Sequence, residues 1–211
     1  MKVLIACEES QAVTIQFRKM GHEAFSCDIQ ECSGGHPEWH YQDDLFTVFE
    51  SEHWDMVIAF PPCTHLSTSG AKHFEGKRLD GRQRESIEFF CKVLNLDCDK
   101  LVVENPVNII SGKYIQEHFP DLCEEYNLPV KPTQRIQPYE HGDQAQKTTC
   151  LWIKGLPVIT PTDIVGKGEF VTTPSGKKLP KWYSDNKSGK ARSKTFPGIA
   201  RAMAEQWGGW L

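Results

Sequence analysis

The chain has 211 residues, which suffices for one domain with a sizeable core, and its net charge is −4 with a pI of about 6.1. This balance argues against a dedicated nucleic-acid-binding protein with a basic surface, and no apolar run approaches the length of a membrane span. The N-terminus reaches Glu8 and Glu9 too soon for a signal peptide, and the eight cysteines lack the spacing of a disulfide framework, so we expect reduced thiols and a cytoplasmic location.

Short apolar runs alternate with helical patterns in the first half of the chain. We predict strands at residues 3–7, 23–28, 54–60 and 100–103. Helices are predicted at residues 11–20, ending at Gly21, and at residues 82–95, which carry a clear apolar stripe. This alternation predicts an α/β fold with a Rossmann-like, doubly wound and mostly parallel sheet.

The pattern changes after Pro106. We predict a short helix near residues 112–119, a late strand at residues 148–153 and an amphipathic helix at residues 197–207. Residues 155–195 are rich in Gly, Pro, Thr, Ser and Lys, which predicts a long loop or small irregular C-terminal insertion for substrate contact, within a single domain over residues 1–211. One interpretation of this segment is that its basic residues hold nucleic-acid phosphates while Trp182 and Tyr183 stack on bases; the other is that it is a solvated loop. The basic residues are Lys177, Lys178, Lys181, Lys187, Lys190, Arg192 and Lys194.

Two polar elements with complementary chemistry follow apolar strands. Phe60-Pro61-Pro62-Cys63 follows one predicted strand, and Glu104-Asn105-Pro106 follows another. Open parallel sheets place their ligands at the carboxyl ends of the strands, so we expect the cysteine and the glutamate to meet there. A thiolate attacks electrophilic ring carbons, and a carboxyl held protonated donates a hydrogen bond, which together activate a pyrimidine ring. The alternatives are a structural cysteine in a tight turn and a glutamate that caps a helix.

Further acids end or follow the predicted strands. Asp28 ends the second strand, where an acid in nucleotide-binding α/β folds accepts hydrogen bonds from ribose hydroxyls. Asp43 and Asp44 follow a polar loop, where one of them receives an adenine amino group or both lie in a solvated turn. Three potential metal ligands lie close together in the sequence: Cys32, His36 and His40. No second pair of ligands follows at the spacing of structural zinc sites, so we expect no metal.

These elements resemble those of the DNA cytosine-5 methyltransferase family. Pro61-Pro62-Cys63 is similar to the family's proline–cysteine loop, and Glu104-Asn105-Pro106-Val107 is similar to its Glu-Asn-Val element. The whole chain resembles a compact group of such proteins carried by phages and prophages, through Lys147 to Trp152 and a terminal Pro-Gly-Ile-Ala segment. The resemblance implies a fold of the class I methyltransferase type, Cys63 as the nucleophile, Glu104 as the contact to the ring nitrogen, and protection of DNA from restriction.

The resemblance also implies S-adenosylmethionine as the cofactor and DNA, duplex or single-stranded, as the partner. Asp28 matches the acid that binds the cofactor ribose, and Asp44-Leu45 resembles the acid–aliphatic element near its adenine. The implied cofactor-binding residues are Ala6, Cys7, Glu8, Asp28, Ile29, Asp44, Leu45 and Pro61. Arg135, which matches one arginine of a Gln-x-Arg-x-Arg element, is implied as a third catalytic residue. The implied substrate-binding residues are Pro62, Ser67, Asn105, Lys181 and Arg192.

Two departures from the family pattern keep other functions open. The first loop, residues 6–11, contains no glycine, whereas the family's loop is glycine-rich so that its backbone approaches the cofactor. Only residues 108–194 remain for reading DNA, because a large separate recognition domain is absent from the pattern. The same chemistry on a free cytidine nucleotide or on RNA is therefore one alternative. A non-catalytic nucleic-acid-binding protein on a methyltransferase fold is another.

Overall fold

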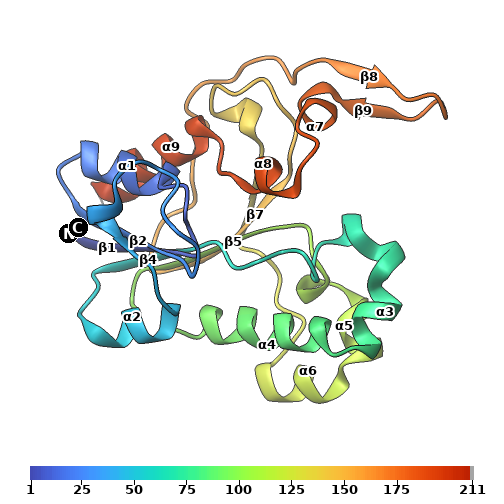
Figure 1. Ribbon diagram of the computed structural model, residues 1–211, viewed down its shortest axis with the longest axis horizontal. Helices are drawn as coiled ribbons and strands as arrows, with labels where there is room; N and C mark the ends of the chain where they lie inside the picture. The colour runs from blue at the N-terminus through green and yellow to red at the C-terminus, as the bar shows by residue number, and fades with distance from the viewer. Residues whose placement is uncertain (210–211) are drawn as a thin grey trace.

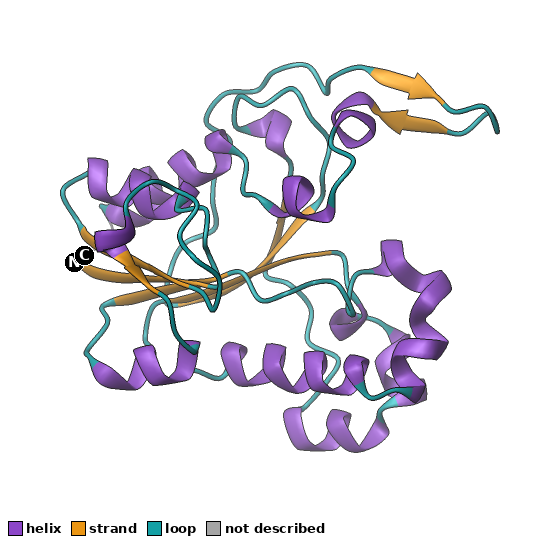
Figure 2. Ribbon diagram, viewed as in Figure 1, coloured by secondary structure: helices purple, strands orange, loops and turns teal. Residues whose placement is uncertain are grey.

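The computed structural model describes residues 1–209, apart from the side chain of Lys190, and is built around a seven-stranded sheet (Figures 1 and 2). The strands are β1 (Lys2–Ala6), β2 (Glu23–Cys27), β3 (His40–Tyr41), β4 (Met56–Ala59), β5 (Leu101–Pro106), β6 (Gln134–Ile136) and β7 (Thr149–Lys154). Their order is β3-β2-β1-β4-β5-β7-β6, and the neighbours from β3 to β5 run parallel. Because the order reverses between β1 and β4, the expected doubly wound, mostly parallel α/β fold is confirmed.

Helices cover both faces of the sheet, as Figure 1 shows. One face carries α1 (Ala12–Lys19) and α9 (Pro197–Gly208), and the other carries α2 (Leu45–Ser51), α4 (Arg82–Leu94), α5 (Lys113–His118) and α6 (Pro120–Tyr126). Helix α3 (Phe74–Leu79) continues from the 3₁₀ helix η2 (Thr68–His73). Shorter 3₁₀ helices are η1 (Pro37–Trp39), η3 (Ile109–Ser111) and η4 (Pro138–Glu140).

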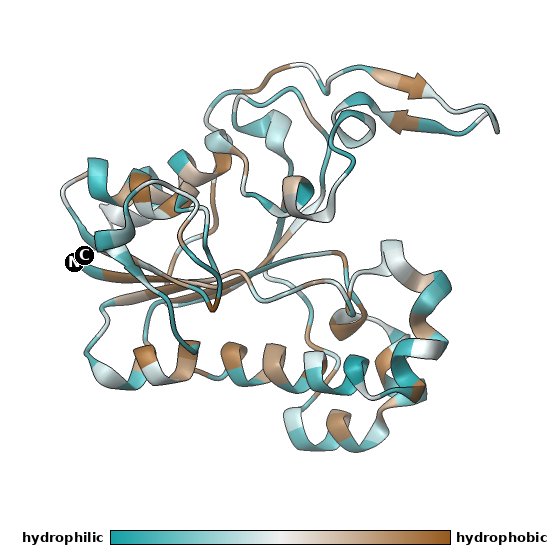
Figure 3. Ribbon diagram, viewed as in Figure 1, coloured by the Kyte–Doolittle hydropathy of each residue, from teal (hydrophilic) through white to brown (hydrophobic). Residues whose placement is uncertain are grey.

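Each face of the sheet has its own hydrophobic core, because successive side chains of a strand point to opposite faces. Leu4, Val57 and Val103 pack into the core beneath α2, α4 and α5. Ile5, Ile58 and Val102 belong to the core shared with α1 and α9. Figure 3 shows the hydrophobic segments on the strands and on the helices that pack against the sheet. Burial on both faces explains why these parallel strands appear in the sequence as continuous apolar runs.

The last two strands of the sheet reverse the parallel pattern. Strand β7 pairs antiparallel with β5, and β6 pairs antiparallel with β7. Pairing with β7 extends β5 to Pro106, three residues beyond the predicted strand, whereas its pairing with β4 stops at Val103. Glu104 and Asn105 therefore lie in strand conformation at the edge where the parallel part of the sheet has ended.

The helices predicted at residues 11–20, 82–95, 112–119 and 197–207 are confirmed to within one residue at each end. Helices α2, α3 and α6 and strands β3 and β6 were not predicted. These helices have only six or seven residues, too few to show a clear apolar period, and the strands have two and three. Within residues 1–209, no helix combines the length and the apolar character that a membrane crossing requires.

Residues 155–195, which we call the lobe, contain short ordered elements joined by irregular chain. The elements are the strands β8 (Phe170–Thr172) and β9 (Lys178–Pro180) and the helices α7 (Lys181–Asp185) and α8 (Gly189–Ser193). The two strands form an antiparallel hairpin that projects away from the sheet, while α7 and α8 lie nearer to β7 (Figure 1). The lobe therefore brings basic residues near the carboxyl ends of the parallel strands.

Candidate active site

A cavity of about 730 Å³ opens at the carboxyl ends of β1, β4 and β5. The loop after β1, residues 7–10, and Asp28 line one end of the cavity. The loop after β4, residues 60–64, and the end of β5, residues 104–107, line the other. Residues 146–148 and parts of α7 and α8 complete the wall. This is the position where an open α/β sheet binds its ligands.

Backbone hydrogen bonds hold the Cys63 loop in a tight turn. The Cys63 carbonyl accepts hydrogen bonds from the N–H groups of Leu66, at 3.0 Å, and Ser67, at 2.9 Å. Pro61 is buried, and Pro62 before the cysteine restricts the backbone of the turn. The Cys63 side chain is partly exposed on the cavity wall. Its surroundings are thus those of an accessible thiol.

Asn105 ties this loop to β5. Its Nδ2 donates to the Pro61 carbonyl at 2.8 Å, and its Oδ1 accepts from Asn108 Nδ2 at 3.0 Å. The N–H of Thr68 donates to the Val107 carbonyl at 3.1 Å, which fastens the far end of the loop to the same segment. The amide of Asn105, predicted to bind substrate, is thus used within the protein, where it fixes the spacing between Cys63 and Glu104.

Replacing Asn105 by alanine is expected to lower the free energy of unfolding by about 1–3 kcal/mol, because the Pro61 carbonyl and the Asn108 amide lose a buried partner. Urea denaturation of the purified protein measures this change. The variant Asn186→Ala is a matched control, since the lost bond to the Trp182 carbonyl lies in the more accessible lobe and water can replace it. Equal losses in the two variants would contradict a special role for Asn105.

Glu104, Cys63 and Lys147 lie together on the cavity wall. Burial raises the pKa of the Glu104 carboxyl, while Lys147 and a hydrogen bond with Thr149 oppose the rise. Burial and the nearby Glu104 raise the pKa of the Cys63 thiol, and Lys147 opposes this rise as well. A raised pKa favours the protonated form of a carboxyl, which donates a hydrogen bond, and this direction agrees with the sequence-based interpretation of Glu104. Lys147 was not predicted as a site residue, because the antiparallel return of β7 brings it there.

The buried Glu8 caps helix α1 from the loop after β1. Its Oε1 accepts from the Val13 N–H at 2.7 Å, and its Oε2 accepts from the Thr14 hydroxyl at 2.8 Å and the Thr14 N–H at 3.3 Å. These bonds satisfy N–H groups that a helix N-terminus otherwise leaves without partners. Burial raises the pKa of this carboxyl to about 7 in spite of the hydrogen bonds. Glu8 therefore lies beside the cavity with its carboxylate already engaged.

Protein stability is expected to fall as the pH rises from about 4.5 to about 7, because folded Glu8 holds its proton more tightly than the unfolded chain does. The difference between the two pKa values corresponds to about 3 kcal/mol. Glu8→Gln removes this contribution. Unfolding free energies of the wild type and the variant, compared at pH 5 and pH 8, should thus shift in favour of the variant at pH 8. A constant difference across that range would contradict the expectation.

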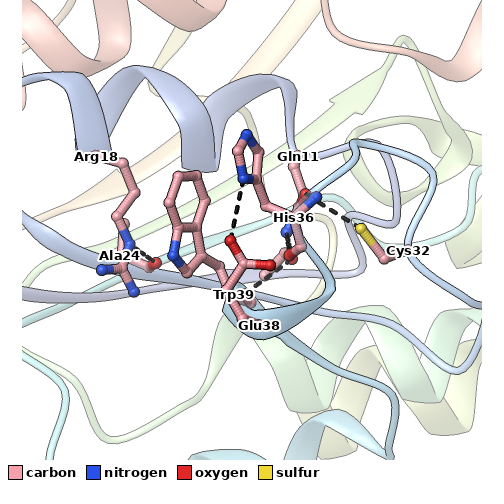
Figure 4. A network of polar contacts seen from close by, with 8 residues as sticks. Gln11, Arg18, Ala24, Cys32, His36, Glu38 and Trp39 are labelled. Carbon is pink, nitrogen blue, oxygen red and sulfur yellow. Dashed lines mark hydrogen bonds and ion pairs between the residues drawn. The ribbon is translucent and has the colours of Figure 1, made fainter.

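The loop without glycine reaches its conformation through two other residues. Cys7 and Gln11 have φ values of 58° and 56°, in the left-handed region that glycine adopts most easily. The side chain of Gln11, fully buried, holds the neighbouring loop (Figure 4). Its Nε2 donates to the His36 carbonyl at 2.8 Å, and its Oε1 accepts from the His36 N–H and the Cys32 thiol at 3.1 Å each. Gln11 thereby holds the loop of residues 28–39 in place. Asp28, the first residue of this loop, lines the cavity.

The potential metal ligands take part in this same network. His40 Nδ1 lies 2.8 Å from Ser26 Oγ, and its Nε2 lies 2.9 Å from the Gln30 carbonyl. The His36 ring stacks on Trp39 with 3.9 Å between centroids. Among the described residues, no group of three or more potential ligands converges on one point.

The structure brings ten of the predicted site residues to the cavity wall. They are Cys7, Glu8, Asp28, Pro61, Pro62, Cys63, Ser67, Glu104, Asn105 and Arg192. The other six do not line it. All of these residues lie in the part of the chain that the structure describes.

Four of the six belong to the cofactor set. Ala6 is fully buried within β1, and Leu45 is buried in the core beneath α2. Ile29 is 77% exposed beyond the cavity rim. Asp44 is the N-cap of α2, where its Oδ1 accepts from the Phe46 N–H at 2.9 Å. Asp44 therefore caps a helix and Leu45 packs into the core, so neither residue of the acid–aliphatic element lines the cavity.

The other two are basic residues with partners elsewhere. Arg135 lies on β6 opposite Cys150 and hydrogen-bonds to its thiol. Lys181 forms an ion pair with Asp185 of the same helix, with 2.6 Å between Nζ and Oδ2. Lys147 is the basic residue that the structure places beside Cys63 and Glu104 instead.

The lobe is fastened to the segment before β7. Trp182 Nε1 donates to the Gln146 carbonyl at 2.8 Å, and Lys147 Nζ donates to the Arg192 carbonyl at 3.1 Å. The Arg192 guanidinium lies over the Tyr183 ring, 4.3 Å from its centroid. The lobe therefore forms part of the cavity wall. The stacked pair of Tyr183 and Arg192 belongs to this part of the wall.

Solved structures resemble this fold at low sequence identity. A methyltransferase of Entamoeba histolytica is 13% identical with a TM-score of 0.51, covering 81% of this chain and 58% of that one. A prophage-encoded E. coli protein described as a DNA modification methyltransferase is 13% identical with a TM-score of 0.47, covering 78% of this chain and 51% of that one. The chain thus spans little more than half the length of either. No family model and no curated protein matches the chain.

The likeness to the E. histolytica enzyme concerns the fold alone. This chain has a methyltransferase-type α/β fold, with a cavity where such a sheet binds its ligands.

Proposed function

We propose that this protein transfers a methyl group from S-adenosylmethionine to carbon 5 of cytosine in DNA. The observation that carries the proposal is the shared cavity, in which the Cys63 thiol and the Glu104 carboxyl lie on one wall and Asp28 lies at the other end. The methyltransferase-type fold supports a methyl donor at that end, as a fold-level analogy.

The loops after β1 and β2 fit the cofactor. Both described hydrogen bonds to the Asp28 carboxylate use Oδ1, the shorter from the Gln30 N–H at 2.9 Å, so Oδ2 is left for a ribose hydroxyl. Glu9 and Asp28 give this end of the cavity acidic side chains, which suit the sulfonium and ammonium groups of S-adenosylmethionine. When bound, the cofactor supplies an electrophilic methyl group.

Cys63 and Glu104 divide the chemistry of the base between them. The Cys63 thiolate adds to carbon 6 of cytosine, and the Glu104 carboxyl donates a hydrogen bond to the ring nitrogen that gains electron density. The electron pair displaced to carbon 5 would form the bond to the methyl group, while the bond from that group to the cofactor sulfur would break and leave S-adenosylhomocysteine. The carbon 5 proton would then pass to a water molecule, and its bonding electron pair would expel Sγ from carbon 6, which restores the ring and the thiolate. The raised pKa of Glu104 supports its part in this scheme.

The lobe suits a nucleic-acid strand. Lys177, Lys178 and Lys187 are exposed on it and can contact phosphates, while Tyr183 and Arg192 offer a stacking surface at the cavity edge. A base in a duplex must first leave the stack, at about a few kcal/mol, whereas a single strand avoids that step.

Transfer of labelled methyl from S-adenosylmethionine tests the proposal. Duplex DNA, single-stranded DNA, RNA and cytidine monophosphate are offered separately, and the products are hydrolysed to nucleosides and separated. Label in 5-methylcytosine from DNA is the expected result. Label found only in RNA or in the free nucleotide would show that DNA is not the substrate, while the proposed reaction at carbon 5 of cytosine would stand. Absence of label from all four, with cofactor binding shown by calorimetry, would contradict the proposal.

A further inference from the structure

Lys147 lies at the meeting point of the candidate catalytic groups and the lobe. It precedes β7 and lines the cavity together with Cys63 and Glu104. Its Nζ donates to the Arg192 carbonyl at 3.1 Å, which holds the ammonium group against α8. The Thr149 hydroxyl, two residues further on, donates to the Lys147 carbonyl at 3.3 Å, and Thr149 also opposes the rise in the pKa of Glu104. The segment is thus held to the lobe at one end and passes beside Glu104 at the other.

We propose that Lys147 is a positioning residue that sets the charge state of the Cys63–Glu104 pair, with its ammonium group held in place by the Arg192 carbonyl of the lobe. This inference rests on the proposed function and adds to it the cation that permits a thiolate to form beside a carboxyl group. Cys63 must lose its proton before its sulfur can bond to carbon 6, and a neighbouring positive charge favours the ionised sulfur.

The charges around Cys63 show why a cation is needed there. Burial and Glu104 on β5 raise the pKa of the thiol, and it stays raised with Lys147 in place, so loss of this cation would raise it further and leave less thiolate at a given pH. Lys147 opposes this more strongly than Lys77 of α3, whose Nζ is bound to the Thr64 carbonyl. Arg192 and Lys194 are the other basic residues on the cavity wall, and they belong to the lobe. Of these cations, Lys147 is the one that also acts on Glu104.

The pH dependence of Cys63 alkylation tests this role without any methyl donor. The full-length protein and the variants Lys147→Met and Lys147→Arg are treated with iodoacetamide between pH 6 and pH 10, and the peptide containing Cys63 is quantified by mass spectrometry. Cys63→Ala provides the blank, and Lys19→Met, at an exposed position on α1, provides the matched control. Far-ultraviolet circular dichroism and thermal denaturation establish that each variant folds.

Lys147→Met is expected to react about tenfold more slowly than the wild type at neutral pH, with its profile displaced to higher pH, because a neighbouring opposite charge typically shifts a pKa by one unit or more. Lys147→Arg should restore the profile to within about threefold, and Lys19→Met should match the wild type. An unchanged profile in Lys147→Met, or in Lys147→Gln if the methionine variant does not fold, would overturn the inference. Failure of the wild type to transfer methyl groups, with the profile still displaced, would remove the proposed function and leave the role of Lys147 in place.

Discussion

Cys63→Ala is expected to lower methyl transfer by about 10³-fold or more, because no other described group on the cavity wall offers a sulfur beside Glu104. The turn itself should persist, since its hydrogen bonds use the Cys63 carbonyl and the alanine keeps that group. Binding of S-adenosylmethionine should also persist, because the cofactor end of the cavity is formed by the loops after β1 and β2. Label incorporation and calorimetric titration, made on the same preparation, separate the two effects.

A matched cysteine variant and a trapped adduct sharpen this prediction. Cys123→Ala, on α6 and away from the cavity, should retain full activity. DNA that carries 5-fluorocytosine should form a lasting covalent complex with the wild type, because carbon 5 has no proton to lose after methyl transfer, and none with Cys63→Ala. Incorporation by Cys63→Ala at the wild-type rate would contradict nucleophilic catalysis at this position.

Glu104→Gln is expected to lower methyl transfer by about 10²- to 10⁴-fold while making the Cys63 thiol more reactive. The amide fills the same volume and still has N–H donors, but it is a far weaker acid than a carboxyl group and stabilises the charge on the ring nitrogen less, which accounts for the slower reaction. The ionised form of Glu104 raises the pKa of Cys63, and the amide has no ionised form, so alkylation should become faster at each pH where part of the wild-type Glu104 is ionised. Opposite changes in the two rates distinguish a catalytic role for Glu104 from a purely structural one.

The control for Glu104 is the hydroxyl that it contacts. Thr149→Val keeps the shape and removes the hydroxyl that opposes the rise in the pKa of Glu104, so this pKa should rise further. Methyl transfer by this variant should extend to higher pH, because the carboxyl keeps its proton longer. A parallel fall of both rates in Glu104→Gln, together with a lowered melting temperature, would point to a structural role instead.

Local patterns in the sequence are sufficient to predict the parallel half of the sheet and the two elements at its edge. Continuous apolar runs arise because the strands are buried on both faces, and the Pro-Pro-Cys and Glu-Asn-Pro segments follow those runs directly. Such features are local, so residues next to one another in the chain reveal them. The expected placement of Cys63 and Glu104 at one edge followed from the direction of the strands alone.

The identity of the other side chains that reach the cavity depends on how the whole chain folds. Asp44 and Glu8 carry the carboxyl groups expected of residues that contact a ligand. Both carboxylates instead accept hydrogen bonds from helix N-termini. Arg135 lies opposite Cys150, whereas Lys147 arrives beside Glu104 because β7 returns antiparallel to β5 across a long separation in sequence. Competition for hydrogen-bond partners and the pairing of distant strands depend on the folded chain as a whole, and no local pattern records them.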